Sequence, residues 1–381
     1  MLSPLLSPRE LSVFSTSYQN ADDAFVASVA ALGGTVGATE LPYDGVGPAG
    51  ESMATRKVWI GDPDAARVLV LLSAVHGVEG FCGSAIQQDL LQRLASGQVR
   101  VPKGLAVLIV HAVNPWGFAW CRRVDEQGID VNRNFIDFSL PLPINAGYRE
   151  LAHALVPESS GSGSGAEVGA GMLQAGDERL TAYLQQHGQY GYELAVSGGQ
   201  YEFADGLFYG GTAKCQARLN LEAIIQELDC PNRDVAVVDL HTGLGPYGHG
   251  ELICDHALES EGLATAKRWY GDAVTIPEGG DSCSVPKTGL VDYAFHAAMG
   301  ARSCYVTLEF GTYPIAELLR CLREDHLIRK PGQQPFTHSD AERVRLQLLK
   351  QFYPAEPQWQ TMVLLRGRQV IQMASQGLLN D

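Results

Sequence analysis

The sequence predicts an α/β fold in which a mixed, largely parallel sheet is flanked by helices on both faces. Three runs of strand length, residues 68–72, 105–111 and 235–240, are almost entirely apolar. Such runs are typical of strands that are buried on both sides. Residues 83–95, between the first two runs, have apolar side chains at helical spacing. A strand–helix–strand unit of this length implies parallel strands.

The other expected elements follow from the same patterns. Short strands are expected at 35–41, 55–60, 250–254 and 304–310. Helices are expected at 18–32, 180–187, 213–228, 316–327, 340–351 and 358–378. The stretch 157–171 is rich in Gly and Ser and predicts a flexible insertion rather than a domain linker. We therefore expect residues 1–381 to form a single catalytic domain.

Composition narrows the class of protein. The 381 residues carry a net charge of −15 and contain no block of Lys or Arg, which argues against binding to nucleic acid or to an anionic membrane. The eight cysteines form no CxxC pair, which argues against a cysteine zinc site and a disulfide framework. Neither a signal peptide nor a membrane-spanning stretch is visible, so we expect a cytoplasmic protein.

The first apolar strand ends in the tetrad His-Gly-Val-Glu, residues 76–79. Open α/β sheets bind their ligands at the carboxyl ends of strands. An imidazole and a carboxylate three positions apart are good partial ligands for zinc. Taken alone, the tetrad fits two interpretations equally well: a partial zinc site, or a hydrogen-bonded loop histidine, His76, followed by an acid at a helix N-terminus, Glu79.

The strand at 235–240 ends in a second histidine, His241, with Asp239 two residues before it. Residues two apart in a strand share a face. A carboxylate in this place can hold the second imidazole nitrogen, as is usual around a metal. Two buried strands that both end in histidine favour a metal site more than either strand does alone.

The strand at 304–310 carries Glu309 close to its end. A carboxylate in an apolar stretch is costly unless it is paired or functional. Its position fits a catalytic group and a structural acid paired with an arginine equally well.

The polar loop 112–135 contains Arg122, Arg123 and Arg133. Guanidinium groups that converge would bind a carboxylate in a bidentate manner. The alternative, which spacing alone favours, is that these arginines lie on the surface and pair with the acids of the same loop, Asp125, Glu126 and Asp130.

These motifs together resemble the zinc carboxypeptidase superfamily, that of carboxypeptidase A. The resemblance covers about residues 65–315 and consists of HxxE at 76–79, DVNRNF at 130–135, DLHT at 239–242 and LEFG at 308–311. The DLHT form and the short glutamate motif are similar to the aspartoacylase and succinylglutamate desuccinylase branch. NPWGF…RRV…DVNRNF is closer to a bacterial carboxypeptidase-like branch.

The resemblance implies a role for each motif. One Zn²⁺ per chain would be held by His76, Glu79 and His241, and Glu309 would be the general base and acid. Arg123, or Arg122 in its place, would stabilise the oxyanion, and Asn132 and Arg133 would bind the substrate carboxylate. The tyrosine that covers the substrate in carboxypeptidases has three candidates here, Tyr247, Tyr293 and Tyr313.

The function expected from this resemblance is zinc-dependent hydrolysis of an amide bond, first of all as a carboxypeptidase that acts on peptides with a free C-terminal carboxylate. The alternative is an N-acyl amino acid deacylase. A serine hydrolase is disfavoured because the chain lacks a G-x-S-x-G nucleophile motif. A non-catalytic zinc-binding protein is a further alternative that no missing residue supports. The sequence does not indicate an oligomeric state.

Overall fold

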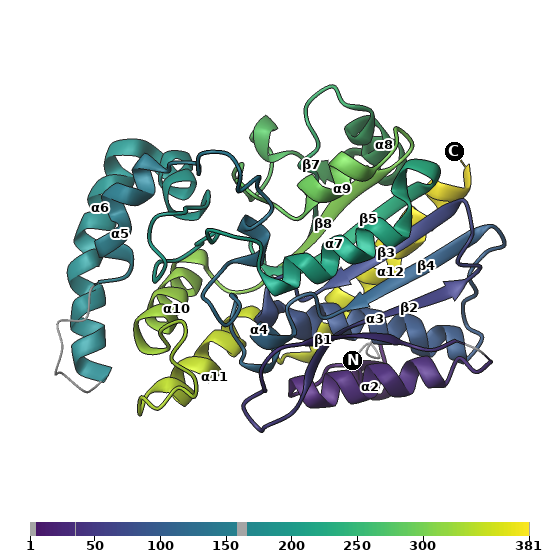
Figure 1. Cartoon of the computed structure of the whole chain (residues 1–381), viewed down its shortest axis with the longest axis horizontal. Coiled ribbons are helices and arrows are strands. Elements are labelled where there is room, and N and C mark those ends of the chain that lie inside the picture. The colour runs from purple at the N-terminus through teal and green to yellow at the C-terminus, as the bar shows by residue number, and fades with distance from the viewer. Residues whose placement is uncertain (1–4, 35, 158–165, 381) are drawn as a thin grey trace.

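The computed structural model of the chain describes residues 5–34, 36–157 and 166–380. Its centre is an eight-stranded sheet with the order β1-β2-β4-β3-β5-β8-β6-β7 (Figure 1). The strands are β1 (Thr39–Tyr43), β2 (Met53–Gly61), β3 (Arg67–Ser73), β4 (Leu105–His111), β5 (Asp234–Gly243), β6 (Gly250–Ile253), β7 (Val274–Thr275) and β8 (Cys304–Gly311).

The sheet is mixed, and its central strands are parallel, which confirms the predicted fold class. β4, β3, β5 and β8 run parallel to one another. β1 and β2 pair antiparallel with each other, β2 with β4, and β6 with β8. The parallel strands therefore end at one common edge, on the left of the sheet in Figure 1.

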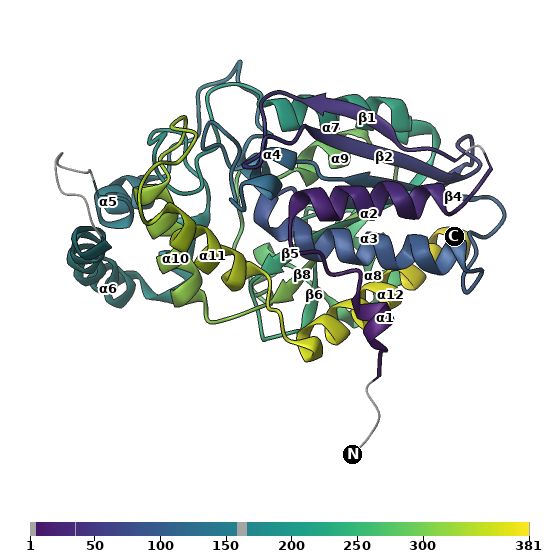
Figure 2. The ribbon, with the colours of Figure 1, turned by 90° about the horizontal axis from the view of Figure 1, so that it is seen from below.

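Helices cover both faces of this sheet (Figure 2). The helices are α1 (Pro8–Leu11), α2 (Tyr18–Ala30), α3 (Gly80–Ala95), α4 (Pro115–Ala119), α5 (Ala146–Leu155), α6 (Ala166–Ser197), α7 (Gln216–Leu228), α8 (Glu261–Tyr270), α9 (Asp292–Ala298), α10 (Ile315–Ile328), α11 (Ala341–Phe352) and α12 (Pro357–Asn380). α7 and α9 pack on one face, and α3, α8 and α12 pack on the other.

β3 shows why a continuously apolar strand lies between two helical layers. Val70 and Leu72 belong to the hydrophobic core on one face of the sheet, and Leu69 and Leu71 belong to the core on the other. Alternate side chains of a strand point to opposite faces of the sheet. When helices cover both faces, both sets of side chains must therefore be apolar.

α5, α6, α10 and α11 lie beyond the edge where the parallel strands end (Figure 1). α6 is 32 residues long and is kinked at Gly188, whose φ is +71°. The prediction of a flexible insertion at 157–171 is wrong for residues 166–171, because they form the first turns of α6. Residues 158–165 lie outside the described part of the chain. The residues after Gly165 include Ala, Glu, Met and Leu, which favour a helix more strongly than the preceding Gly/Ser run suggests.

Two expectations about the whole chain can be compared with the structure. None of the eight cysteines, all of which lie in the described part of the chain, forms a disulfide, and seven of them are buried. Among the described residues, no helix is both long enough and apolar enough to cross a membrane.

Candidate active site

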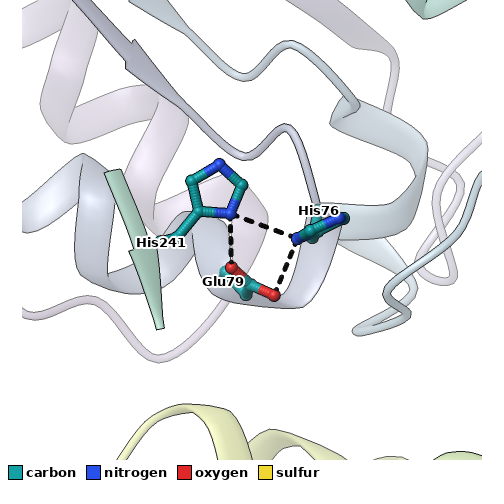
Figure 3. Close-up of side chains that lie close together, drawn as sticks. All are labelled: His76, Glu79 and His241. Atoms are coloured by element: carbon teal, nitrogen blue, oxygen red, sulfur yellow. Dashed lines mark hydrogen bonds and ion pairs between the residues drawn. The ribbon is translucent and has the colours of Figure 1, made fainter. Parts of the chain in front are cut away.

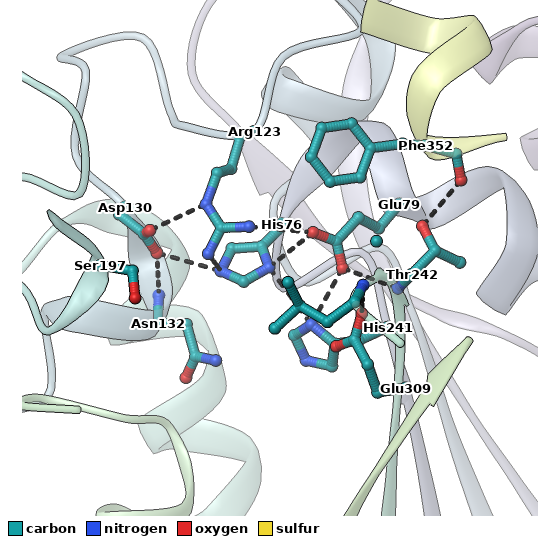
Figure 4. A network of polar contacts seen from close by, with 12 residues as sticks. His76, Glu79, Arg123, Asp130, Asn132, Ser197, His241, Thr242, Glu309 and Phe352 are labelled. Atoms are coloured by element: carbon teal, nitrogen blue, oxygen red, sulfur yellow. Dashed lines mark hydrogen bonds and ion pairs between the residues drawn. The ribbon is translucent and has the colours of Figure 1, made fainter. Parts of the chain in front are cut away.

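The side chains singled out in the sequence reach the site from three adjoining strands, β3, β5 and β8. His76 follows β3 after a two-residue turn, and His241 lies near the end of β5. His241 is paired in register with Glu309 of β8. The sheet therefore brings an imidazole, a second imidazole and a carboxylate to the same edge (Figure 4).

The turn between β3 and His76 has a strained backbone. Ala74 has a φ of +58°, in the left-handed region that residues with a Cβ rarely adopt. The loop after β4 fixes this conformation, because the Asn114 N–H donates to the Ala74 carbonyl at 2.8 Å. Strain of this kind persists where the surroundings hold it, commonly at functional sites.

Glycine is required at position 77 because two backbone segments touch there. A Cβ on Gly77 would lie 2.0 Å from the carbonyl carbon of Gly117 in α4. The N–H groups of Gly77 and Val78 also donate to the carbonyls of Arg123 and Arg122, at 3.1 and 2.8 Å. The loop that carries the arginines thus supports the short 3₁₀ helix Gly77–Glu79 directly.

His76, Glu79 and His241 form a compact, buried group (Figure 3). His76 Nδ1 lies 2.9 Å from one Glu79 oxygen, and His241 Nδ1 lies 3.0 Å from the other. The two Nδ1 atoms are 3.2 Å apart. Zinc ligands at tetrahedral angles and ~2.1 Å from the ion are separated by about 3.4 Å. The three side chains could therefore hold a zinc ion with small adjustments.

A carboxylate lies at the outer nitrogen of each histidine. Asp239 Oδ2 lies 2.7 Å from His241 Nε2, as the sequence predicted, and also accepts a hydrogen bond from the Tyr305 hydroxyl at 2.6 Å. Asp130 Oδ1 lies 3.1 Å from His76 Nε2. At His241, a carboxylate that accepts the Nε2–H leaves the Nδ1 lone pair free for a metal.

Glu79 and Asp130 are charged although they are buried. Burial alone would raise the pKa of Glu79, but the His76 and His241 rings hold it well below its usual range. Burial would likewise raise the pKa of Asp130, but Arg123 and then His76 hold it well below its usual range. The site therefore concentrates negative charge, which suits a divalent cation.

Arg123 connects these two carboxylates. Its guanidinium lies 3.1 Å from Glu79 Oε1 and 3.0 Å from Asp130 Oδ2, and Nη2 is 2.7 Å from His76 Nε2. It also lies over the ring of Phe208, 5.3 Å from its centre. The pairing with Asp130 was foreseen as a structural alternative, but the result is a guanidinium beside the metal-binding group rather than on the surface.

Glu309 lies in the same cavity and has no cationic partner within 4 Å among the described residues. One of its oxygens accepts the Leu244 N–H at 2.9 Å. Burial, followed by the neighbouring Glu79 carboxylate, raises the pKa of Glu309 to about 7. A carboxyl group with this pKa can accept and release a proton near neutral pH.

The structure does not bring Arg122 into the cavity. Its side chain is fully buried and pairs with Asp325 of α10 at 2.8 Å. Arg329 pairs with the same carboxylate. Arg122 therefore lies outside the cavity, and the position expected for it at the oxyanion or the substrate is wrong.

Arg133 does line the cavity, and its charge is not paired with an acid. It is 1% exposed and donates to the Asn132 and Ser197 carbonyls, at 2.6 and 2.9 Å. Its Nε atom has no hydrogen-bond partner, and no carboxylate pairs with it in the described part of the chain. A buried guanidinium of this kind is costly unless an anion completes it.

Asn132 also lines the cavity, and its side-chain oxygen accepts the Val291 N–H at 2.8 Å. The amide nitrogen of this side chain is therefore the group that can face a ligand. None of the three candidate tyrosines lines the cavity with it. Tyr247 and Tyr313 bond to Glu356, and Tyr293 donates to the Lys287 carbonyl.

The part of the cavity near the strand ends is also lined by Asp255, Lys287 and Asp292, which no sequence motif pointed to. Asp292 is 3% exposed and its Oδ1 atom has no hydrogen-bond partner. Burial, then Asp255 and Asp239, raises its pKa well above the usual range. Asp255 follows the short buried strand β6, whereas Lys287 and Asp292 lie before and at the start of α9, where only the tertiary fold reveals their position.

A family model described as "Protein of unknown function (DUF2817)" matches residues 14–366. None of the curated protein sequences matched the chain. The fold is similar to that of carboxypeptidase A from Helicoverpa armigera, with 15% identity, a TM-score of 0.45, and 95% of this chain and 74% of that chain covered.

Two further solved structures are similar to this chain at comparably low identity. Thrombin activatable fibrinolysis inhibitor has 12% identity and a TM-score of 0.47, with 99% of this chain and 78% of that chain covered. Succinylglutamate desuccinylase from Chromobacterium violaceum has 16% identity and a TM-score of 0.34, with 90% and 75% covered. Similarity at this level does not indicate a substrate.

Proposed function

The chain belongs to the DUF2817 family, whose function is unknown, and we propose that it is a zinc-dependent hydrolase of amides whose amine half carries a free carboxylate. One observation carries this proposal: a buried His-Glu-His group, with a carboxylate at each outer nitrogen, shares its cavity with Glu309. A carboxypeptidase and an N-acyl amino acid deacylase both meet this description.

His76, Glu79 and His241 would hold the metal, which leaves one coordination position open, as in catalytic zinc sites. When bound there, zinc supplies Lewis acidity at the scissile carbonyl and lowers the pKa of water to about 7. Asp130 and Asp239 orient the two imidazoles for this purpose.

Glu309 would move the proton. Its pKa of about 7 allows it to take a proton from the attacking water and give it to the departing amine. The Leu244 N–H fixes one carboxyl oxygen, so the other remains free for the reaction. Arg123 would place positive charge beside the developing oxyanion.

Arg133 and Asn132 would select the substrate. A carboxylate on the amine half would complete the unpaired Arg133 guanidinium and accept a hydrogen bond from the Asn132 amide. The Arg133 guanidinium lies over the ring of Phe208, 5.6 Å from the ring centre, and this contact holds the guanidinium in place.

The test is hydrolysis of matched amides that end in a free carboxylate or in a carboxamide. We expect turnover of the carboxylate form, loss of activity after chelation and its return with zinc. Glu309→Gln should lower kcat by about 10²–10⁴-fold without releasing the metal. The matched control Glu278→Gln, at an exposed position, should have wild-type activity.

Arg133→Gln tests the substrate half of the proposal. It should raise KM for the carboxylate substrate and leave the carboxamide unaffected, because only the first uses the guanidinium. Equal preference for the two substrates in the wild type, or full activity of Glu309→Gln, would overturn the proposed function.

A further inference from the structure

The cavity that contains the metal-binding group extends well beyond it. Its volume is about 570 Å³, within the range of sites that enclose a small organic ligand. One part is formed by the strand ends and the loops before α9. The other part is lined by residues of α6 and α10. These two helices lie beyond the edge where the parallel strands end (Figure 1). We refer to this second part as the helical arm, defined by Leu180, Leu184 and Val196 of α6 and by Leu318, Leu319 and Leu322 of α10.

The helical arm begins next to the metal-binding group. A Cβ on Gly243, two residues after His241, would lie 3.2 Å from the Leu318 side chain. Arg133 lies at the C-terminal end of α6, past the arm residue Val196, where its Nη2 donates to the Ser197 carbonyl at 2.9 Å. The scissile carbonyl, at the metal-binding group, and the substrate carboxylate, at Arg133, would therefore lie at the ends of the arm, which leaves the arm itself for the acyl half of the substrate.

Several polar side chains of the arm are already paired, and Thr181, Tyr192 and Arg320 also line it. Arg323 pairs with Asp177 at 2.5 Å and donates to the Leu155 carbonyl at 2.9 Å. Gln189 donates to Glu193 at 2.5 Å. In contrast, the part near the strands contains the unpartnered Asp292 Oδ1 and Arg133 Nε atoms. The unpartnered polar atoms near the strands therefore suit the polar half of a ligand, and the apolar side chains of the arm suit an apolar half.

We propose that the helical arm binds the acyl half of the substrate as a hydrocarbon chain, so that the substrates are amino acids N-acylated with medium or long fatty acyl groups. This inference rests on the proposed function. A peptide on the acyl side would place its amide groups against leucine and valine side chains, where unpaired amides are costly. A hydrocarbon chain has no such groups and gains from every CH₂ that it buries.

The test is a series of N-acyl derivatives of one amino acid, from acetyl to dodecanoyl, with an apolar peptide of similar length as the comparison. We expect kcat/KM to rise about fourfold for each CH₂, equivalent to ~0.8 kcal/mol, until the arm is filled. A flat or falling series, or a peptide that is faster than every acyl substrate, would overturn the inference.

Leu184→Ser and Leu319→Ser place a hydroxyl on each wall of the arm and should flatten this rise. Each should lower the ratio of kcat/KM for dodecanoyl to that for acetyl substrate by about tenfold, and Leu184→Met should restore it. Leu219→Ser, at a half-exposed position of α7, is the matched control and should keep the wild-type ratio.

Failure of this inference can be distinguished from failure of the proposed function. If no amide of any length is hydrolysed, the proposed function is wrong, and calorimetric binding of dodecanoyl and acetyl amino acids then decides about the arm. Tighter binding of the dodecanoyl compound, weakened in Leu319→Ser, supports the arm. Equal binding of the two compounds overturns it.

Discussion

Asp239 lies behind the metal-binding group and touches two side chains of the site. Its Oδ2 atom lies 2.7 Å from His241 Nε2 and 2.6 Å from the Tyr305 hydroxyl. These contacts fix both the orientation and the tautomer of the imidazole. The residue therefore acts on a metal through His241 rather than by direct contact.

Replacement of this carboxylate should weaken metal binding without removing a ligand. Asp239→Asn is expected to lower zinc affinity by about 10–100-fold, the usual effect of losing such a partner. Competition with a chelator of known affinity measures it. Asp234→Asn, in the same strand but paired with the exposed Arg302, is the control. Wild-type affinity in Asp239→Asn would show that the contact does not orient the ligand.

His111 is a buried histidine that has no place in the proposed mechanism. Its Nε2 atom forms a hydrogen bond with the Ser84 hydroxyl at 2.9 Å. Its ring stacks on that of Phe25, with 4.5 Å between the ring centres. The charged groups around it are Asp22, 3.9 Å from Nδ1, and Arg56. Burial, followed by Arg56, lowers its pKa to about 3.

This pKa makes the stability of the protein depend on pH. Because an unfolded histidine has a pKa of about 6.5, the unfolded chain binds the proton more readily, and stability falls as the pH drops below that value. His111 alone should remove about 2 kcal/mol of unfolding free energy between pH 7 and pH 5. His111→Gln should reduce this loss by that amount in urea unfolding at the two pH values. An unchanged pH dependence would contradict the assignment.

The 3₁₀ helix Gly77–Glu79 carries two of the proposed ligands at its ends and lies against α4. Its position is set by backbone contact, since a Cβ on Gly77 would meet the carbonyl carbon of Gly117 at 2.0 Å. Neither backbone can move without moving His76 or the loop that carries Arg123.

Gly77→Ala should therefore displace the ligands while the sheet remains. We expect loss of tightly bound zinc with nearly unchanged far-UV circular dichroism. Gly37→Ala is the matched control, because nothing lies within 4 Å of a Cβ at that position. Normal zinc content in Gly77→Ala would contradict the geometry of this contact.

Apolar patterning made the strands and the residues at their ends predictable. β4 has the predicted bounds, and β3, β5 and β8 agree with their predicted positions to within a few residues. Each buried strand must be apolar on both faces, so a polar residue at its end stands out in the sequence. His76, His241, Glu309 and Asp239 were found in this way.

The residues that were missed have contacts that no local pattern encodes. Asp130 was seen only as a possible partner for an arginine, whereas it also contacts His76, 54 positions earlier. Arg122 and Arg123 are adjacent, and only packing decides that Arg122 meets Asp325 of α10. The extent of α6 was also missed, because a Gly/Ser run concealed the start of a helix.

One continuous sheet joins the two hydrophobic cores. Alternate residues of β3 and β5 enter the core on each face. The helices beyond the strand ends are connected to the rest by the buried pair of Arg122 with Asp325, and removal of one partner from such a pair typically costs about 3–5 kcal/mol. These links support the prediction of a single domain.

We accordingly expect one cooperative unfolding transition. Circular dichroism and tryptophan fluorescence should give coincident curves, because Trp116 and Trp359 lie in opposite cores. Zinc should shift the common midpoint upward, since it binds the folded chain preferentially. Two separated transitions, the first confined to the helices around α6, would contradict a single domain.

The most direct test of the metal site is the zinc content of the purified protein, measured by elemental analysis for the wild type and for Glu79→Ala and His241→Ala. His249→Ala, at an exposed position outside the group, is the control. We predict about one zinc per chain in the wild type and the control, as a catalytic site with three protein ligands requires, and its loss in the other two variants. No tightly bound metal in the wild type, or zinc retained in both ligand variants, would contradict the proposed site and the mechanism built on it.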